Sequence, residues 1–310
     1  MKLKKALNPL SQLASVFLLT AIGLFSSCNP EGITPTPGNY IIQGPQDLEP
    51  AFSRDGNYIV YRHFDDLSNS PGNYQTGLYI INRDGSNRKL VLLGTRLSPA
   101  WSPDGQWLVF SSLGTLQKCK TDGSSLTTFT GLNQLKYPEF YFPDWSNDGK
   151  HIIFDNPFPS DGGGVFQANC DFKNSKLLFG LNQSGGIGND PEFSPDETQI
   201  IYYSGAKGYD FSEIFVRDTI GNSIVRLTQN NRDDRAPTWS YDGTRIAWSS
   251  NVRLCIMNAN GSNQQEISYG SQPSWSINNE IVFSHANADY SKEVLYTISP
   301  DGKNKKQITF

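Results

Sequence analysis

Residues 98–110 read SPAWSPDGQWLVF, and this stretch decides the fold. A short segment ends at the aromatic Trp101. Ser-x-Asp-Gly then marks a tight turn, because Asp bonds to its own backbone and Gly readily adopts positive φ. The alternating apolar segment Leu108–Phe110 follows the turn. The stretch therefore predicts two antiparallel strands joined by a short hairpin turn.

The same pattern occurs six times along the chain. The six anchor aromatics are Phe52, Trp101, Trp145, Phe193, Trp239 and Trp275, with spacings of 49, 44, 48, 46 and 36 residues. Four of the six Trp residues of the chain occupy this one position, which makes a chance alignment untenable. A period of about 44 residues is that of a β-propeller blade.

A second turn and two further strands complete each repeat. In the first repeat the apolar segment Leu78–Ile81 ends in Asp84-Gly85, and another apolar segment follows. Two turn signals per repeat without a helical period indicate an antiparallel meander. We therefore expect an all-β fold over residues 40–310: a six-bladed β-propeller of four-stranded antiparallel blades. Either residues 40–43 or residues 306–310 supply the outermost strand of the sixth blade.

The N-terminal residues have the pattern of an export signal. Lys2, Lys4 and Lys5 precede an apolar run over residues 13–25, which is too short to span a bilayer as a helix. The run ends in Ser-Ser before Cys28, which resembles a bacterial lipoprotein signal. We expect a signal peptide over 1–27, lipidation of Cys28 and a tether over 28–39. A plain secreted protein and an uncleaved anchor are the alternatives.

This reading places the protein in the bacterial cell envelope, on the outer membrane, facing the periplasm or the surface. The lipid would be its only membrane attachment. Cleavage would change the formal net charge from −4 to −7, because it removes three lysines and no acid.

The repeats resemble the WD40-like PD40 repeats of the TolB family, whose blades carry P-x-W-S-P-D-G. The closest matches are SPAWSPDGQWLVF from Ser98 and APTWSYDGTRIAW from Ala236. The resemblance implies the propeller fold and an envelope setting, and it says little about activity. TolB proteins carry an α/β domain ahead of the propeller. Residues 30–47 leave no room for it, so the contacts of that domain are not carried over.

Composition and motifs exclude several functions. Only 18% of residues are charged and no basic run is present, so we expect no nucleic-acid partner. No nucleophile elbow, zinc-protease or phosphate-binding motif occurs, and we expect no catalytic residue, metal or cofactor. Cys119, Cys170 and Cys255 fall on third strands and read as buried thiols. A Cys119–Cys170 bridge is the less favoured alternative.

The loops divide between two faces. In a meander the first–second and third–fourth turns share one face, and these are the short Asp-Gly turns. The variable connections lie on the opposite face, where binding function concentrates. Seven aromatic residues fall in these connections, and they form either an exposed patch for a protein or sugar or a small core within the loops. They are Tyr137, Phe140, Tyr141, Phe142, Phe158, Tyr209 and Phe211.

Polar residues form a second candidate set near the axis. His63 and His285 end second strands in the first and sixth blades, which adjoin when the ring closes. The innermost strands carry four acids: Glu49, Asp144, Asp190 and Glu192. Acids around a funnel suit a cation or a cationic side chain, and two His suit a metal. A water-filled channel lined by solvated polar groups is the alternative.

The leading hypothesis is a monomeric, non-catalytic envelope lipoprotein that binds a protein or a cell-wall polymer through the variable-loop face. The alternative is a carbohydrate-active hydrolase or lyase that uses the acids or His around the funnel, and it requires two suitably spaced carboxylates. A third reading is a structural paralogue within a larger complex.

Overall fold

The computed structural model describes residues 44–65, 75–129, 139–158, 163–180, 186–205, 211–220, 223–288 and 290–310. Cys28, the tether and the expected strand at 40–43 lie outside these ranges. The described residues form twenty-four strands and no helix. Accordingly, none of the segments described is a helix that could cross a membrane.

The strands follow one another in six antiparallel meanders of four, as the repeats predict. The first strands are β1 (Gln46–Phe52), β5 (Leu97–Trp101), β9 (Tyr141–Trp145), β13 (Asn189–Phe193), β17 (Asp234–Trp239) and β21 (Ser271–Trp275). The second strands are β2 (Tyr58–Phe64), β6 (Trp107–Ser112), β10 (His151–Asn156), β14 (Gln199–Ser204), β18 (Arg245–Ser250) and β22 (Ile281–Ala286). The third strands are β3 (Gly77–Asn82), β7 (Thr115–Lys120), β11 (Gly164–Asn169), β15 (Glu213–Asp218), β19 (Arg253–Asn258) and β23 (Glu293–Ile298). The fourth strands are β4 (Lys89–Leu93), β8 (Thr127–Thr128), β12 (Lys176–Gly180), β16 (Ile224–Arg226), β20 (Gln265–Tyr269) and β24 (Lys306–Gln307).

The all-β propeller of four-stranded antiparallel blades is confirmed, but the expectation of six separate blades is wrong. Four meanders are separate four-stranded sheets, and β1–β4 and β21–β24 join in one eight-stranded sheet. The cause is a parallel pair between Gln46 of β1 and Glu293 of β23. The amide of Glu293 also donates to the carbonyl of Pro45 at 3.3 Å. The strand that completes the last meander is β24, which pairs with β23.

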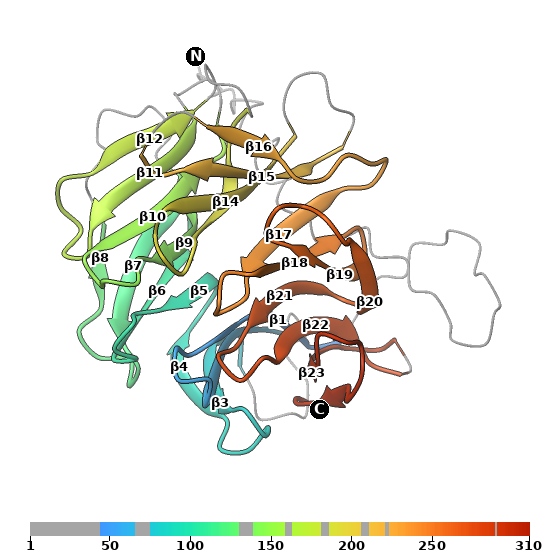
Figure 1. Cartoon of the computed structure of the whole chain (residues 1–310). Coiled ribbons are helices and arrows are strands. Elements are labelled where there is room, and N and C mark those ends of the chain that lie inside the picture. The colour runs from blue at the N-terminus through green and yellow to red at the C-terminus, as the bar shows by residue number, and fades with distance from the viewer. Residues whose placement is uncertain are drawn as a thin grey trace, which may run out of the picture. The chain divides into compact units, whose positions relative to one another are not determined.

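Hydrophobic cores lie between consecutive meanders. Among the described residues there are six clusters of buried hydrophobic side chains, and each draws on two successive meanders. One of them packs Phe52 and Tyr61 of the first meander against Val282 and Leu295 of the last. The first strands contact one another in order, and β21 contacts β1. In Figure 1 these first strands lie toward the centre and strands such as β12, β16 and β20 lie outside.

Each first strand contains an irregularity just before its proline. The residues at this position all have φ between 47° and 54°, in the left-handed region. They are Glu49, Ser98, Phe142, Asp190, Ala236 and Gln272. The register to the second strand shifts at the same place. Such bulges re-aim side chains near functional sites, and two of the four predicted acids, Glu49 and Asp190, occupy this position.

The Asp-Gly turns also hold the ring together, and this leads to a test. Gly85 has φ of 91°, and a Cβ there would lie 2.7 Å from the carbonyl oxygen of Ile308 in the last meander. Gly105 has φ of 67° with nothing within 4 Å of its Cβ position. We expect Gly85→Ala to lower the free energy of unfolding by about 2–3 kcal/mol and Gly105→Ala by about 1 kcal/mol. Urea unfolding measures both, and equal losses would contradict a close contact at the seam.

Candidate functional site

Three of the predicted acids tie their own strand to the next meander. Glu49 Oε2 accepts from the amide of Ser98 at 2.6 Å. Asp144 Oδ2 accepts from the amide of Phe193 at 3.1 Å, and Glu192 Oε1 accepts from the amide of Trp239 at 2.9 Å. Charge-assisted bonds of this kind are strong. The carboxylates therefore help to hold the first strands around the axis.

The four acids, Glu49, Asp144, Asp190 and Glu192, also interact electrostatically, and we call them the inner acid cluster. Burial, followed by the charges of Glu49 and Asp144, raises the pKa of Asp190 to about 7. Burial raises the pKa of Asp144 to about 6, although the amide of Phe193 opposes the shift. Burial and the charge of Asp144 raise the pKa of Glu192 well above its usual value. Like charges that share a low-dielectric site resist ionising together.

Asp190 differs from the other three acids. No described group hydrogen-bonds its carboxylate oxygens, whereas its amide donates to Asp155 Oδ2 at 3.2 Å. Asp155 itself is buried, and burial raises its pKa well above the usual value. Asp190 is thus an acid without a structural bond of its own in a strongly acidic environment, which is typical of a functional position.

The first strands end at the face that carries the short Asp-Gly turns, which we call the short-turn face. Turn residues around Arg54 connect distant meanders at this face, and we call them the Arg54 layer. The guanidinium of Arg54 donates to Asn147 Oδ1 and lies 5.6 Å from the ring centre of Tyr241. Asn147 Nδ2 donates to the carbonyl of Pro195 at 2.7 Å. Arg54 also lowers the pKa of Asp144 against the effect of burial. This layer joins four meanders at the end away from the variable loops.

Both predicted histidines pack against aromatic neighbours, and His285 stacks on Tyr269 of the preceding meander. His63 Nδ1 lies 2.7 Å from Asp47 Oδ1, and the ring is buried against Tyr79. Burial lowers the pKa of His285 to about 4, with a smaller contribution from Lys305. Among the residues described, no group of three His, Cys, Asp or Glu could hold a metal ion. The geometry therefore favours structural roles for both rings.

The predicted aromatic set does not form one surface. Phe140 is 3% exposed and packs edge-to-face on Phe129 and Phe154. Tyr141 is half-buried, and its hydroxyl donates to Glu139 at 2.7 Å. Phe142 and Phe158 are also half-buried, and Phe211 is 38% exposed. Tyr137 and Tyr209 lie outside the described residues. Phe140 therefore belongs neither to an exposed patch nor to a core within the loops, because it packs into the core between the second and third meanders.

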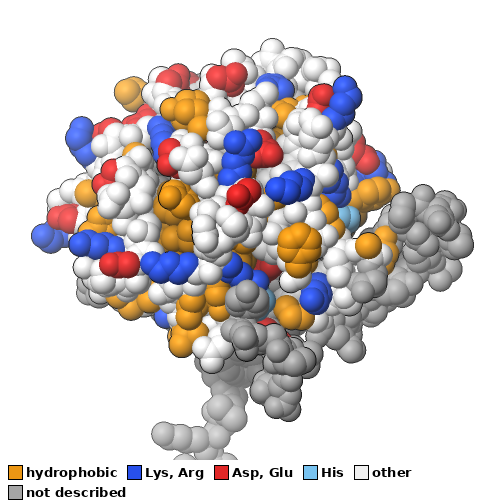
Figure 2. All heavy atoms as spheres, turned by 90° about the horizontal axis from the view of Figure 1, so that it is seen from below, with side chains coloured by type: hydrophobic (Ala, Val, Ile, Leu, Met, Phe, Trp, Pro, Cys, Tyr) orange, Lys and Arg blue, Asp and Glu red, His pale blue; other side chains and the backbone are white. Residues whose placement is uncertain are grey.

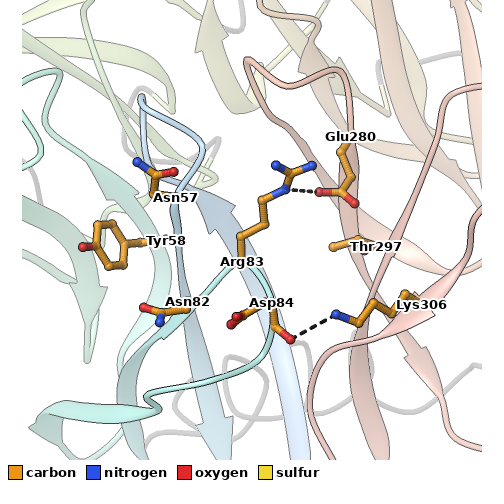
Figure 3. Close-up of a pocket in the computed structure, with 8 residues that line it drawn as sticks. All are labelled: Asn57, Tyr58, Asn82, Arg83, Asp84, Glu280, Thr297 and Lys306. Carbon is orange, nitrogen blue, oxygen red and sulfur yellow. Dashed lines mark hydrogen bonds and ion pairs between the residues drawn. The ribbon is translucent and has the colours of Figure 1, made fainter.

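Sequence reasoning missed a polar pocket on the short-turn face. It has a volume of about 530 Å³ and lies between the first and last meanders (Figure 3). Arg83 Nε donates to Glu280 Oε2 at 2.6 Å across it, and Lys306 Nζ donates to the carbonyl of Asp84 at 3.1 Å. The first turn of the sixth repeat, SINNE, is one residue shorter than SRDGNY in the first. This difference in turn length was the feature of the sequence that could have indicated the pocket.

Charge on the outer surface is mixed. On the face that Figure 2 shows, Lys and Arg side chains are interspersed with Asp and Glu and with hydrophobic side chains. Mixed charge of this kind produces no strong field of one sign on that face.

The fold and the repeated Ser-x-Asp-Gly turns define a β-propeller of the WD40-like class. Residues 67–310 match the TolB beta propeller domain, and the chain belongs to this family. Putative TolB from Agrobacterium tumefaciens is similar in structure, with a TM-score of 0.62 and 18% identity over 72% of this chain and 84% of that one. TolB from Acinetobacter baumannii has a TM-score of 0.61 and 21% identity over 84% of this chain and 78% of that one.

A curated relative shares part of the chain. An uncharacterized protein of Agrobacterium fabrum is 31% identical over 121 residues, which is 35% of this chain. The match spans 40% of the length of that relative. This likeness carries no function.

Proposed function

We propose that the protein is a non-catalytic binding component of the bacterial envelope, tethered by a lipid on Cys28. In this proposal the signal peptide is removed before Cys28, residues 28–39 form the tether and the propeller binds a protein partner. Membership of the TolB propeller family supports the envelope setting. The three lysines, the apolar run and Cys28 support the anchor.

The partner binds from the variable-loop side and places a cationic segment against the inner acid cluster. The observation that carries this proposal is Asp190, whose carboxylate accepts no hydrogen bond from the described residues and whose pKa is raised to about 7 by burial and by neighbouring acids. A Lys or Arg side chain would relieve that repulsion and restore the ionised form. The Arg54 layer lies over the inner strands on the short-turn face. A partner is therefore favoured to approach the inner acid cluster from the variable-loop face.

A hydrolytic or lyase function has less support. Such chemistry needs one carboxylate free to transfer a proton and another placed to act with it. Asp144 and Glu192 are instead hydrogen-bonded to the amides of the next meander. Those bonds favour a role in holding the strands.

The proposal is tested with a labelled peptide rich in Lys and Arg, and with capture from the source envelope. We expect the peptide to bind, with an affinity that falls as salt rises. Asp190→Asn should weaken binding about tenfold, and the same variant should recover less of the captured partner.

The control is Asp301→Asn, which removes one charge from an exposed turn on the short-turn face. It should change peptide affinity less than about twofold. Equal binding by both variants would mean that the inner acid cluster does not receive the partner.

A further inference from the structure

The pocket between the first and last meanders is built from short turns that are far apart in the sequence. Asn57 and Tyr58 follow the first turn of the first meander, and Asn82 begins its second turn. Glu280 ends the first turn of the last meander. The volume of about 530 Å³ falls in the range of small-molecule sites. In Figure 3 Arg83 and Asp84 of the first meander meet Glu280 and Lys306 of the last, whereas the ring of Tyr58 points away from them.

The charges that line the pocket balance. Arg83 forms an ion pair with Glu280, and the ammonium of Lys306 donates to the backbone carbonyl of Asp84. Two cations and two anions leave no net formal charge. A lining without net charge offers neither an anionic nor a cationic ligand a net electrostatic attraction. The lining therefore favours a neutral ligand.

The uncharged lining suits a molecule that carries hydroxyl groups on an apolar ring. Asn57 and Asn82 supply amide donors and acceptors, and sugar hydroxyls both donate and accept. Tyr58 is 44% exposed, and its ring centre lies 6.4 Å from that of Trp101. The ring lies on the side of β2 that faces the second meander, so it offers an apolar surface with a polar edge at the rim of the pocket.

Thr297 supplies a further polar group to the lining of the pocket. Its side chain lines the pocket although the residue is only 1% exposed. Figure 3 shows the side chain directed toward Arg83. No group in the described part of the chain hydrogen-bonds its hydroxyl. The hydroxyl is therefore available to a hydroxyl or amide group of a molecule in the pocket.

We propose that this pocket binds a short neutral oligosaccharide. The site is on the face opposite to the variable loops, so it is separate from the partner site proposed above. One end of the glycan contacts Thr297, and the other end reaches the exposed ring of Tyr58 at the rim. The two Asn residues and the charged side chains bind its hydroxyl groups. The propeller would then hold a glycan on one face and a protein on the other.

The test uses cellotriose, maltotriose and triacetylchitotriose as probes, with binding followed by titration calorimetry on the whole protein. At least one of these should bind with a Kd of about 1 mM or lower. Tyr58→Ala should weaken that binding about tenfold and Thr297→Val about fivefold. Tyr241→Ala is the matched control, because Tyr241 is a 45% exposed tyrosine of a short turn outside the pocket, and it should leave affinity unchanged.

Other outcomes overturn the proposal. Absence of binding by all three neutral probes at about 10 mM would do so. Equal affinity in Tyr58→Ala and the parent protein would also do so, as would a preference for a trigalacturonate or a chitosan trimer over the neutral probes. Failure here leaves the peptide experiment on the inner acid cluster unaffected, because the two sites share no residue.

Discussion

Replacing Phe140 with alanine is expected to lower the free energy of unfolding by about 3–5 kcal/mol. The side chain is 3% exposed and packs edge-to-face on Phe129 at 5.5 Å and on Phe154 at 5.2 Å. The cluster spans the second and third meanders, so the cavity would open between two blades. Urea unfolding followed by Trp fluorescence measures the loss.

Phe211 provides the matched control. It is a predicted loop aromatic of the same type, but it is 38% exposed. Phe211→Ala should change stability by less than about 0.5 kcal/mol. If both variants lowered the free energy of unfolding by the same small amount, the packing of Phe140 against its two neighbours would not stabilise the fold.

The contrast between these two residues shows the limit of sequence reasoning. Both lie in variable connections without periodic neighbours, and nothing local distinguishes a residue that folds back from one that faces solvent. Strands and turns were predictable, because Trp101 and the Asp-Gly turns recur at a fixed phase. Local turn chemistry and period-2 patterns depend on near neighbours, which are visible in the sequence.

Contacts between distant residues were not predictable in the same way. The pair of Gln46 and Glu293 joins two meanders in one sheet through a single parallel contact. Arg83 and Glu280, which cross the pocket, are 197 positions apart. The six-repeat alignment placed these meanders side by side. The side-chain pairs between the first and last meanders depend on turn lengths and rotamers. An alignment of the six repeats does not contain this information.

The inner acid cluster was found from the sequence, but its energetics came from the structure. Glu49, Asp144, Asp190 and Glu192 were identified by their position on first strands. Their backbone partners in the next meander were not foreseen. The left-handed φ of Asp190 was also unforeseen. Glu49 shares this left-handed φ, so it is the lack of a bond to the next meander that distinguishes Asp190 from the three acids that hold strands.

Asp190→Asn is expected to stabilise the protein at pH 8 by about 2–4 kcal/mol and to have little effect near pH 4. The folded-state pKa of Asp190 is about 7, whereas an unfolded Asp titrates near 3.9. Between these values the unfolded chain has released the proton and the folded chain retains it. The raised pKa of Asp190 therefore lowers the free energy of unfolding by an amount that grows as the pH rises from about 4 to about 7 and then stays constant. Asn removes this titration and tolerates the φ of 52°.

The control for this prediction has the opposite sign. Bonds from the Lys150 amide and the Ser146 hydroxyl lower the pKa of Asp148 to about 2, so its carboxylate adds stability above pH 4 that is lost as the pH falls through about 2. Asp148→Asn should therefore destabilise the protein at pH 7. Urea unfolding of both variants at pH 4.5 and pH 8 makes the comparison. Destabilisation by Asp190→Asn at both pH values would show that this acid has a structural bond. If Asp190→Asn is more stable and no longer binds the basic peptide, the native aspartate lowers stability and is needed for binding.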